Sequence, residues 1–163
     1  MNMEILDCMK ADHMRIRTIL AELTSEFASP EWKYRLFRDV SVLAESHSKA
    51  KEATLLRFAR EISEENMDVR AMIFKSYEKH ALMEELVQKI RVTEDPEAWE
   101  AKVSVYCDWL ELHLREEEEV LFPEIEARLE AVEGLQLGET YLRLREIGMG
   151  HDPAHQLRFL SVV

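Results

Sequence analysis

His113 and Glu117 stand four residues apart in a run, Trp109 to Pro123, whose apolar residues follow helical spacing. On an α-helix two residues four positions apart lie on the same face, about one turn from each other. An imidazole nitrogen and a carboxylate oxygen placed in this way can bind one metal ion, and iron, zinc and manganese all accept such ligands. The pattern predicts half of a metal site, which other helices would have to complete.

Four of the six histidines are almost evenly spaced, at intervals of 34, 33 and 33 residues: His13, His47, His80 and His113. Each lies in an apolar stripe with the three- and four-residue steps of an amphipathic helix. The midpoints between successive histidines, residues 30, 63–64 and 96–97, all fall in predicted turns. Residues equidistant from a turn lie at one height in an antiparallel bundle, so we expect all four imidazoles at one level of the core.

A single histidine on an apolar face is more often a core residue satisfied by a hydrogen bond than a metal ligand. Four imidazoles at one level change this balance, because each unsatisfied buried nitrogen costs about 1–3 kcal/mol. A shared metal ion satisfies the four together. The remaining two histidines, His151 and His155, lie outside the pattern, and we expect them at the surface of an irregular C-terminal segment.

Four helices joined by short polar turns would position these residues. The apolar stripe predicts a first helix from about Met3 to Phe27. A cap residue followed by proline predicts helix starts at Pro30 and Pro96, and Ser63 or Asn66 can cap the third helix. Pro123 should kink or interrupt the fourth helix, because proline removes a hydrogen bond inside a helix.

The expected architecture is all-α: an up-down-up-down antiparallel four-helix bundle over residues 1–133, with residues 134–163 as a short C-terminal extension of the same domain. In that extension the segment from Gly134 to Gly138 predicts a break. Residues 139–147 follow as a short helix, and irregular chain is expected from Gly148 onward.

Composition excludes several classes of function. The chain has 163 residues with a formal charge of -12, which disfavours binding to nucleic acid or to anionic membranes. No apolar run approaches the length of a membrane span, so a cytoplasmic location is the default expectation. The sequence also lacks a Gly-rich phosphate loop and a nucleophile elbow. We therefore expect a metal-binding or sensor protein rather than a conventional enzyme.

The motifs resemble the hemerythrin-like, or HHE cation-binding, domains over about residues 3–130. The resemblance lies in the run Asp12-His13-Met-Arg-Ile-Arg, the single histidines of the second and third helices, and His113-Leu-Arg-Glu-Glu117 in the fourth. It implies a four-helix bundle with a non-haem di-iron centre that carries or senses dioxygen, nitric oxide or iron level. It also implies iron ligands, with Glu117 as a bridging carboxylate: His13, His47, His80, His113 and Glu117. By contrast, the Glu-x-x-His signature of ferritin-like bundles is absent.

Lys51 departs from the family pattern, because the second helix of the family normally reads His-x-x-x-Glu and this chain has His47-Ser-Lys-Ala-Lys51. On a regular helix Glu52 would face away from His47, whereas Glu84 shares the inward stripe of the third helix and is a tentative replacement ligand. Lys51 either extends its ammonium to the bundle edge or places it beside Glu117 or Glu84. In the second case it takes the electrostatic place of one metal ion.

Two classes of function remain open. One is an iron-binding hemerythrin-like protein that binds or senses a small ligand at a site of histidines and carboxylates. The other is a helical bundle that has lost one or both metal ions and acts as a regulatory or interaction module. The histidines and Glu117 favour the first class, and Lys51 favours the second class or a site with one metal ion.

Overall fold

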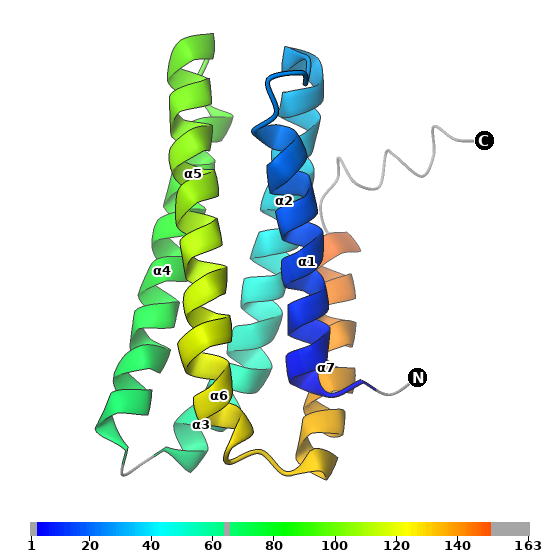
Figure 1. Ribbon diagram of the computed structural model, residues 1–163, viewed down its shortest axis with the longest axis vertical. Helices are drawn as coiled ribbons and strands as arrows, with labels where there is room; N and C mark the ends of the chain where they lie inside the picture. The colour runs from blue at the N-terminus through cyan, green and yellow to red at the C-terminus, as the bar shows by residue number, and fades with distance from the viewer. Residues whose placement is uncertain (1–2, 64–65, 151–163) are drawn as a thin grey trace, which may run out of the picture.

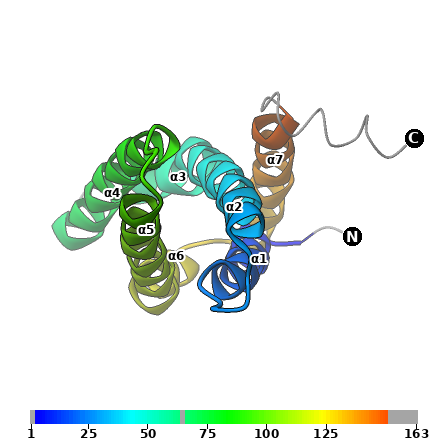
Figure 2. The same ribbon diagram turned by 90° about the horizontal axis from the view of Figure 1, so that it is seen from above.

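The computed structural model describes residues 3–63 and 66–150, and within these ranges it contains helices and no strands. Figure 1 shows the long helices side by side, and Figure 2 shows them from one end. His151 and His155, which we expected at the surface, lie outside the described residues. The elements, in chain order, are α1 (Ile5–Leu23), α2 (Pro30–Lys51), the π-helix η1 (Glu52–Leu56), α3 (Arg57–Ile62), α4 (Met67–Arg91), α5 (Pro96–Glu116), the π-helix η2 (Glu117–Leu121), α6 (Phe122–Glu126) and α7 (Ala131–Gly150).

Side-chain caps start three of the long helices where the sequence predicted. Ser29 accepts a hydrogen bond from the backbone N–H of Trp32, and Pro30 follows it as the first residue of α2. Asp95 caps α5 in the same way ahead of Pro96. Asn66, rather than Ser63, caps α4. These caps satisfy backbone N–H groups that have no partner inside their helix, which fixes where each helix begins.

Two apolar clusters form the core. One contains Ile16, Leu43, Met83 and Leu110 among others, and the second contains Met9, Leu55, Ile73 and Phe122. On α1, α2 and α4 the histidine lies between the residues that enter one cluster and those that enter the other. On α5 Leu114 of the first cluster still follows His113, and the second cluster begins at Leu121 in η2. The polar level therefore separates two apolar layers, and the packing of both layers holds the histidines at a common height.

α1 and α5 differ in detail from the expectation. α1 ends at Leu23, and Phe27, which the apolar stripe had included, is almost fully exposed. The interruption predicted at Pro123 is present but begins earlier, because regular α-helix stops at Glu116 and η2 follows. Proline is accommodated at the start of α6, where a missing N–H costs little.

α7 corrects the prediction of a break at Gly134–Gly138 and of irregular chain from Gly148, because it continues through all three glycines to Gly150. It packs against α1 and α2, outside the other long helices (Figure 2). A Cβ at Gly138 would lie 2.3 Å from the carbonyl oxygen of Met3, and one at Gly148 would lie 2.9 Å from Ser46 Oγ. The glycines therefore permit close helix contact, which outweighs their low helix propensity of about 1 kcal/mol relative to alanine.

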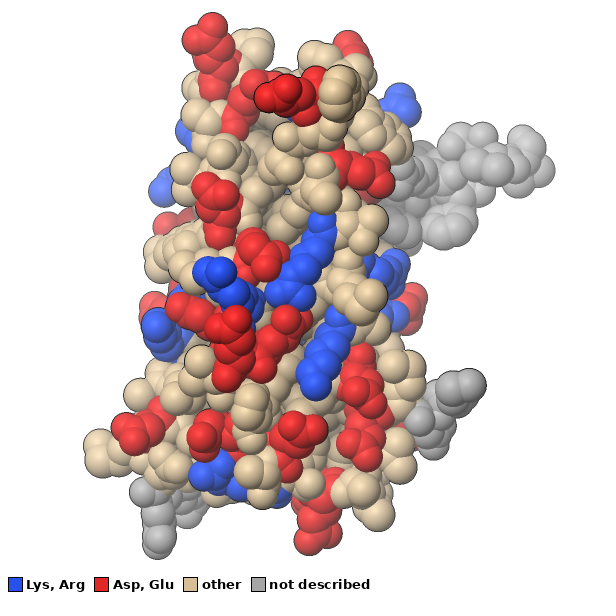
Figure 3. Space-filling view, in the orientation of Figure 1, with Lys and Arg blue, Asp and Glu red and all other residues tan. Residues whose placement is uncertain are grey.

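Acidic and basic side chains are interspersed on the face in Figure 3, and the basic ones drawn there form no continuous surface. In residues 3–63 and 66–150, no helix combines the length and the apolar composition that crossing a membrane requires.

Candidate metal centre

The structure brings the four evenly spaced histidines to one carboxylate, Glu117. Two groups of three buried side chains have donor atoms within 4.8 Å of one another: His13 with His47 and Glu117, and His80 with His113 and Glu117. All five side chains are buried, and Glu117 is only 2% exposed. Because Glu117 belongs to both groups, the centre consists of two halves that share one carboxylate.

The His13–His47 half comprises His13, His47 and the Oε2 atom of Glu117. His13 Nε2 lies 3.5 Å and His47 Nε2 lies 4.0 Å from Glu117 Oε2. Among residues 3–63 and 66–150, none of these three buried atoms has a hydrogen-bond partner. Buried polar atoms without partners are rare, because each costs about 1–3 kcal/mol. Three of them converging on one point are the donor set that a metal ion would satisfy.

The His80–His113 half comprises His80, His113 and the Oε1 atom of Glu117. His80 Nε2 and His113 Nε2 are 3.1 Å apart, and His113 Nε2 lies 3.1 Å from Glu117 Oε1. The Lys51 ammonium donates to the same Oε1 and lies 3.4 Å from His113 Nε2. Lys51 is fully buried, so it does not extend to the bundle edge. Protein groups already satisfy this half.

Charge at the centre is balanced without a metal ion. Burial alone would raise the pKa of the Glu117 carboxyl, but Lys51 and His113 outweigh it and hold that pKa well below its usual range. Burial lowers the pKa of His13, His80 and His113, so these imidazoles are neutral, the state in which histidine binds a metal. Burial also lowers the pKa of Lys51, although Glu117 opposes the shift. One ammonium thus faces one carboxylate.

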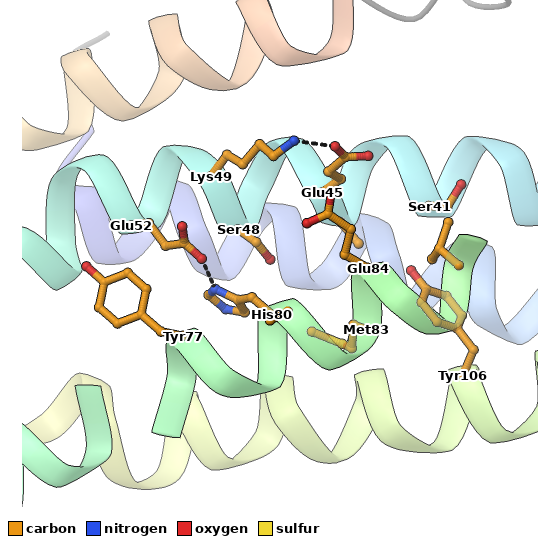
Figure 4. A pocket seen from close by; sticks show the side chains of 13 residues that line it. Ser41, Glu45, Ser48, Lys49, Glu52, Tyr77, His80, Met83, Glu84 and Tyr106 are labelled. Carbon is orange, nitrogen blue, oxygen red and sulfur yellow. Dashed lines mark hydrogen bonds and ion pairs between the residues drawn. The ribbon is translucent and has the colours of Figure 1, made fainter. Parts of the chain in front are cut away.

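Two carboxylates orient imidazoles from outside the centre. Glu118 Oε1 lies 2.7 Å from His13 Nδ1, and Glu52 Oε1 lies 2.6 Å from His80 Nδ1 (Figure 4). A carboxylate at Nδ1 keeps the proton there and leaves Nε2 free to bind. Glu118 is only 26% exposed and also contacts Arg17.

Glu52 and Glu118 both lie at the start of a π-helix. η1 begins at Glu52, directly after Lys51, and η2 begins at Glu117. Single π-helical turns inside helices are rare and are frequent at functional sites. Glu52 faces away from the His13–His47 half, as regular spacing predicted, but it reaches His80 on α4.

Glu84, the tentative replacement ligand, lies apart from both groups. It is exposed and lines a cavity of about 230 Å³ between α2 and α4, together with Glu52, His80 and Tyr77 (Figure 4). Lys51 contacts Glu117 rather than Glu84. The position of Glu84 gives no support to a role as the missing carboxylate.

A second network, missed by reasoning from the sequence, reaches His47 from α7. The Tyr141 hydroxyl donates to Asp12 Oδ2 at 2.5 Å and lies 2.6 Å from His47 Nδ1. Arg145 donates to the other oxygen of Asp12 at 2.6 Å. Burial alone would raise the pKa of Asp12, but the nearby His47, the hydrogen bond from Tyr141 and the charge of Arg145 lower it. The Asp12-His13 pair in the sequence was the only signal of this network.

The donor set fits a metal ion in the His13–His47 half, where two imidazole nitrogens and one carboxylate oxygen are unpaired. The His80–His113 half does not offer an unpaired donor of this kind. Comparison with known families gives an independent result: the model of the family described as Hemerythrin HHE cation binding domain matches residues 4–125. The resemblance drawn from the histidine motifs is thereby confirmed. No curated protein and no solved structure matches the chain.

Proposed function

This chain belongs to the hemerythrin HHE cation-binding domain family, and from that premise we propose that it is a non-haem iron protein holding one ion between His13, His47 and Glu117. The observation that carries the proposal is the set of three unpaired buried donor atoms in this half of the centre. We further propose the family's up-down-up-down order for α1, α2, α4 and α5, which the short turns between successive long helices support.

Iron is the metal that this donor set favours. Two histidines and one carboxylate with open coordination positions are typical of non-haem Fe(II) proteins, and no thiolate biases the site toward softer metals. Three protein ligands would leave positions for a small ligand such as dioxygen or nitric oxide. The two apolar layers above and below the polar level exclude water from its surroundings, which favours binding or sensing of a diatomic molecule.

Lys51 takes the electrostatic place of a second ion in this proposal. Its ammonium lies against the Glu117 oxygen that faces the His80–His113 half, where a bridging carboxylate would meet the other iron. A cation placed there repels a metal ion and neutralises Glu117 without one.

A second candidate function is a bundle without metal that acts as a regulatory or interaction module. The Lys51–Glu117 contact favours it, because this ion pair keeps the buried carboxylate satisfied when no metal is bound. The two candidates differ in one measurable quantity, which is the metal content of the folded protein.

Metal content after aerobic expression with iron therefore tests the proposal. We expect about one iron ion per chain, without the visible absorption of an oxo-bridged diferric centre. A folded protein without metal would support the second candidate and overturn the first. About two ions per chain would contradict the role of Lys51.

The Lys51→Glu variant tests that role directly, because it restores a carboxylate four residues after His47. We expect its metal content to rise to about two ions per chain. Lys49→Glu is the matched control, since Lys49 is an exposed lysine on the same helix that pairs with Glu45. A Lys51→Glu protein that still binds about one ion would show that this lysine does not limit occupancy.

A further inference from the structure

Tyr141 lies between a candidate ligand and a buried carboxylate. Its hydroxyl oxygen is 2.5 Å from Asp12 Oδ2 and 2.6 Å from His47 Nδ1. All three side chains are at least 98% buried, so solvent does not compete for these hydrogen bonds. The Tyr141 hydroxyl thus joins α1, α2 and α7 at one point.

Counting protons fixes the direction of each hydrogen bond. A phenol has one proton to donate, and Asp12, which also faces the Arg145 guanidinium, is a carboxylate that only accepts. The Tyr141 hydroxyl therefore donates to Asp12 and must accept from His47. His47 then carries a proton on Nδ1, and in the neutral imidazole its Nε2 has a free lone pair.

The free lone pair belongs to the nitrogen that faces the metal position. His47 Nε2 lies 4.0 Å from Glu117 Oε2 and has no hydrogen-bond partner in the part of the chain that the structure describes. In the opposite tautomer, the proton on Nε2 would point toward Glu117 and block the position of an ion. The direct distance from His47 Nδ1 to Asp12 Oδ2 is 3.9 Å, too long for Asp12 to fix the tautomer without the tyrosine.

We propose that Tyr141 is a positioning residue of the centre, which accepts the Nδ1 proton of His47 and so holds the tautomer whose Nε2 can bind a metal ion. The effect of Tyr141 on metal binding rests on the proposed function, whereas the His47 tautomer is a property of the metal-free protein. α7 lies beyond the residues that match the family model, 4–125, so a segment outside that match supports the ligand.

The packing of α7 explains how Tyr141 reaches this depth. Gly138, Tyr141, Arg145 and Gly148 follow steps of three and four residues and share one face of the helix. The two glycines let α7 approach the backbone near Met3 and the side chain of Ser46. Between these two contacts, Tyr141 and Arg145 reach Asp12 from the same face.

The experiment reads the His47 tautomer in metal-free protein by long-range ¹H–¹⁵N correlation NMR, with His47 assigned from a His47→Gln spectrum. We expect an Nδ1–H tautomer in the wild-type chain and loss of its dominance in Tyr141→Phe, which removes one oxygen and keeps the ring. Tyr106→Phe is the matched control, because Tyr106 is equally buried and does not contact His47. An Nε2–H tautomer in the wild type, or an unchanged tautomer in Tyr141→Phe, would overturn the proposal.

Asp12→Asn is a second variant that tests the proton count. Its amide oxygen would face Arg145 and its NH₂ group would donate to Tyr141, so the phenol would donate to His47 Nδ1 instead. We expect His47 to switch to the Nε2–H tautomer, the kind of change that an aspartate-to-asparagine substitution produces behind a catalytic histidine. Retention of Nδ1–H in Asp12→Asn would contradict the assigned direction of the bonds.

Titration with Fe(II) under anaerobic conditions then separates this inference from the proposed function. We expect Tyr141→Phe to bind about 10–100-fold more weakly than wild type, and Tyr106→Phe to bind equally well. If the wild-type chain shows the Nδ1–H tautomer but binds no metal, the proposed function fails and the positioning of His47 stands. If it binds iron and Tyr141→Phe keeps both tautomer and affinity, the inference fails and the proposed function stands.

Discussion

The two halves of the centre contain the same groups and differ in what satisfies them. Each half has two imidazoles and one oxygen of Glu117. In the His13–His47 half all three inward atoms lack partners, whereas in the His80–His113 half the Lys51 ammonium and the two imidazoles satisfy one another. The lysine at position 51 therefore makes a nearly symmetric set of candidate donors asymmetric.

The outer carboxylates do not share this asymmetry. His13 has Glu118 and His80 has Glu52 at the outer ring nitrogen, at 2.7 and 2.6 Å. In both halves a carboxylate thus orients one imidazole so that its Nε2 faces the centre. The halves differ in whether the Lys51 ammonium lies between the inward atoms. The residues that orient the imidazoles therefore differ from the residue, Lys51, that occupies one half, so substitutions can alter the two features one at a time.

The largest expected effect comes from removing the Lys51 charge. Lys51→Met keeps the length of the side chain but leaves Glu117 as a buried charge without its main partner, which costs about 3–5 kcal/mol. We expect the metal-free variant to be destabilised by about this amount in urea unfolding monitored by circular dichroism. Iron at about 100 times its dissociation constant should restore about 2.7 kcal/mol, because it binds only the folded state.

Lys49→Met is the control for this prediction. Lys49 forms an exposed pair with Glu45 four residues earlier, and such a pair contributes about 0.3–0.5 kcal/mol. If Lys51→Met were no less stable than Lys49→Met, the ammonium would not be the counter-charge of Glu117, and the contrast between the halves would lose its basis.

The next largest effect should appear when one imidazole is removed from the His13–His47 half but not when one is removed from the His80–His113 half. Leucine has nearly the volume of histidine and no donor atom. We expect His13→Leu to weaken Fe(II) binding by at least about 100-fold, the upper end of the effect of losing an outer partner, because His13 would be a direct ligand. His80→Leu should change the affinity by less than about threefold, since its half holds Lys51.

Isothermal titration of both variants with Fe(II) under anaerobic conditions provides the measurement, after circular dichroism has shown equal helix content. Equal losses in the two variants would mean that the ion contacts both halves. A loss in His80→Leu alone would place the ion in the other half, despite Lys51.

The sequence predicted much of the fold because its signals are local. Cap residues followed by proline identified the starts of α2 and α5 through bonds that span three residues. The spacing of the histidines from the predicted turns likewise gave their positions along the helices, because each residue of an α-helix adds a fixed rise. The break predicted at Gly134–Gly138 was wrong, because the role of Gly138 depends on its contact with the backbone near Met3, which is distant in the sequence. Helix propensity alone gives no indication of such a contact.

The inward histidines and Glu117 could be identified from periodicity, but their outer partners could not. Glu118 follows an inward residue, and regular α-helical geometry turns it about 100° away. Glu118 is nevertheless held at the centre by His13, which is 105 residues away in the sequence. Tyr141 lies 94 residues from His47, and no local pattern links them.

The smallest effect, and the finest test of the comparison, concerns these outer carboxylates. Glu118→Gln and Glu52→Gln remove the same charge from equivalent positions, one behind each half. A glutamine amide oxygen can still accept the Nδ1 proton, but a neutral acceptor makes the ring less basic than a carboxylate does. We expect Glu118→Gln to weaken Fe(II) binding about tenfold, at the lower end of the range for outer partners.

Glu52→Gln should leave the affinity unchanged, because His80 would not be a ligand of the single ion. In Lys51→Glu, which we expect to bind about two ions, Glu52→Gln should weaken binding of the second ion about tenfold. Titration of Glu118→Gln, Glu52→Gln and the Lys51→Glu/Glu52→Gln double variant with Fe(II) is the measurement. It shows whether the two halves differ because Lys51 occupies one of them or because their imidazoles are oriented differently. If Glu52→Gln weakened the first ion as much as Glu118→Gln does, both outer carboxylates would serve one shared site, and the division of the centre into two halves would be wrong.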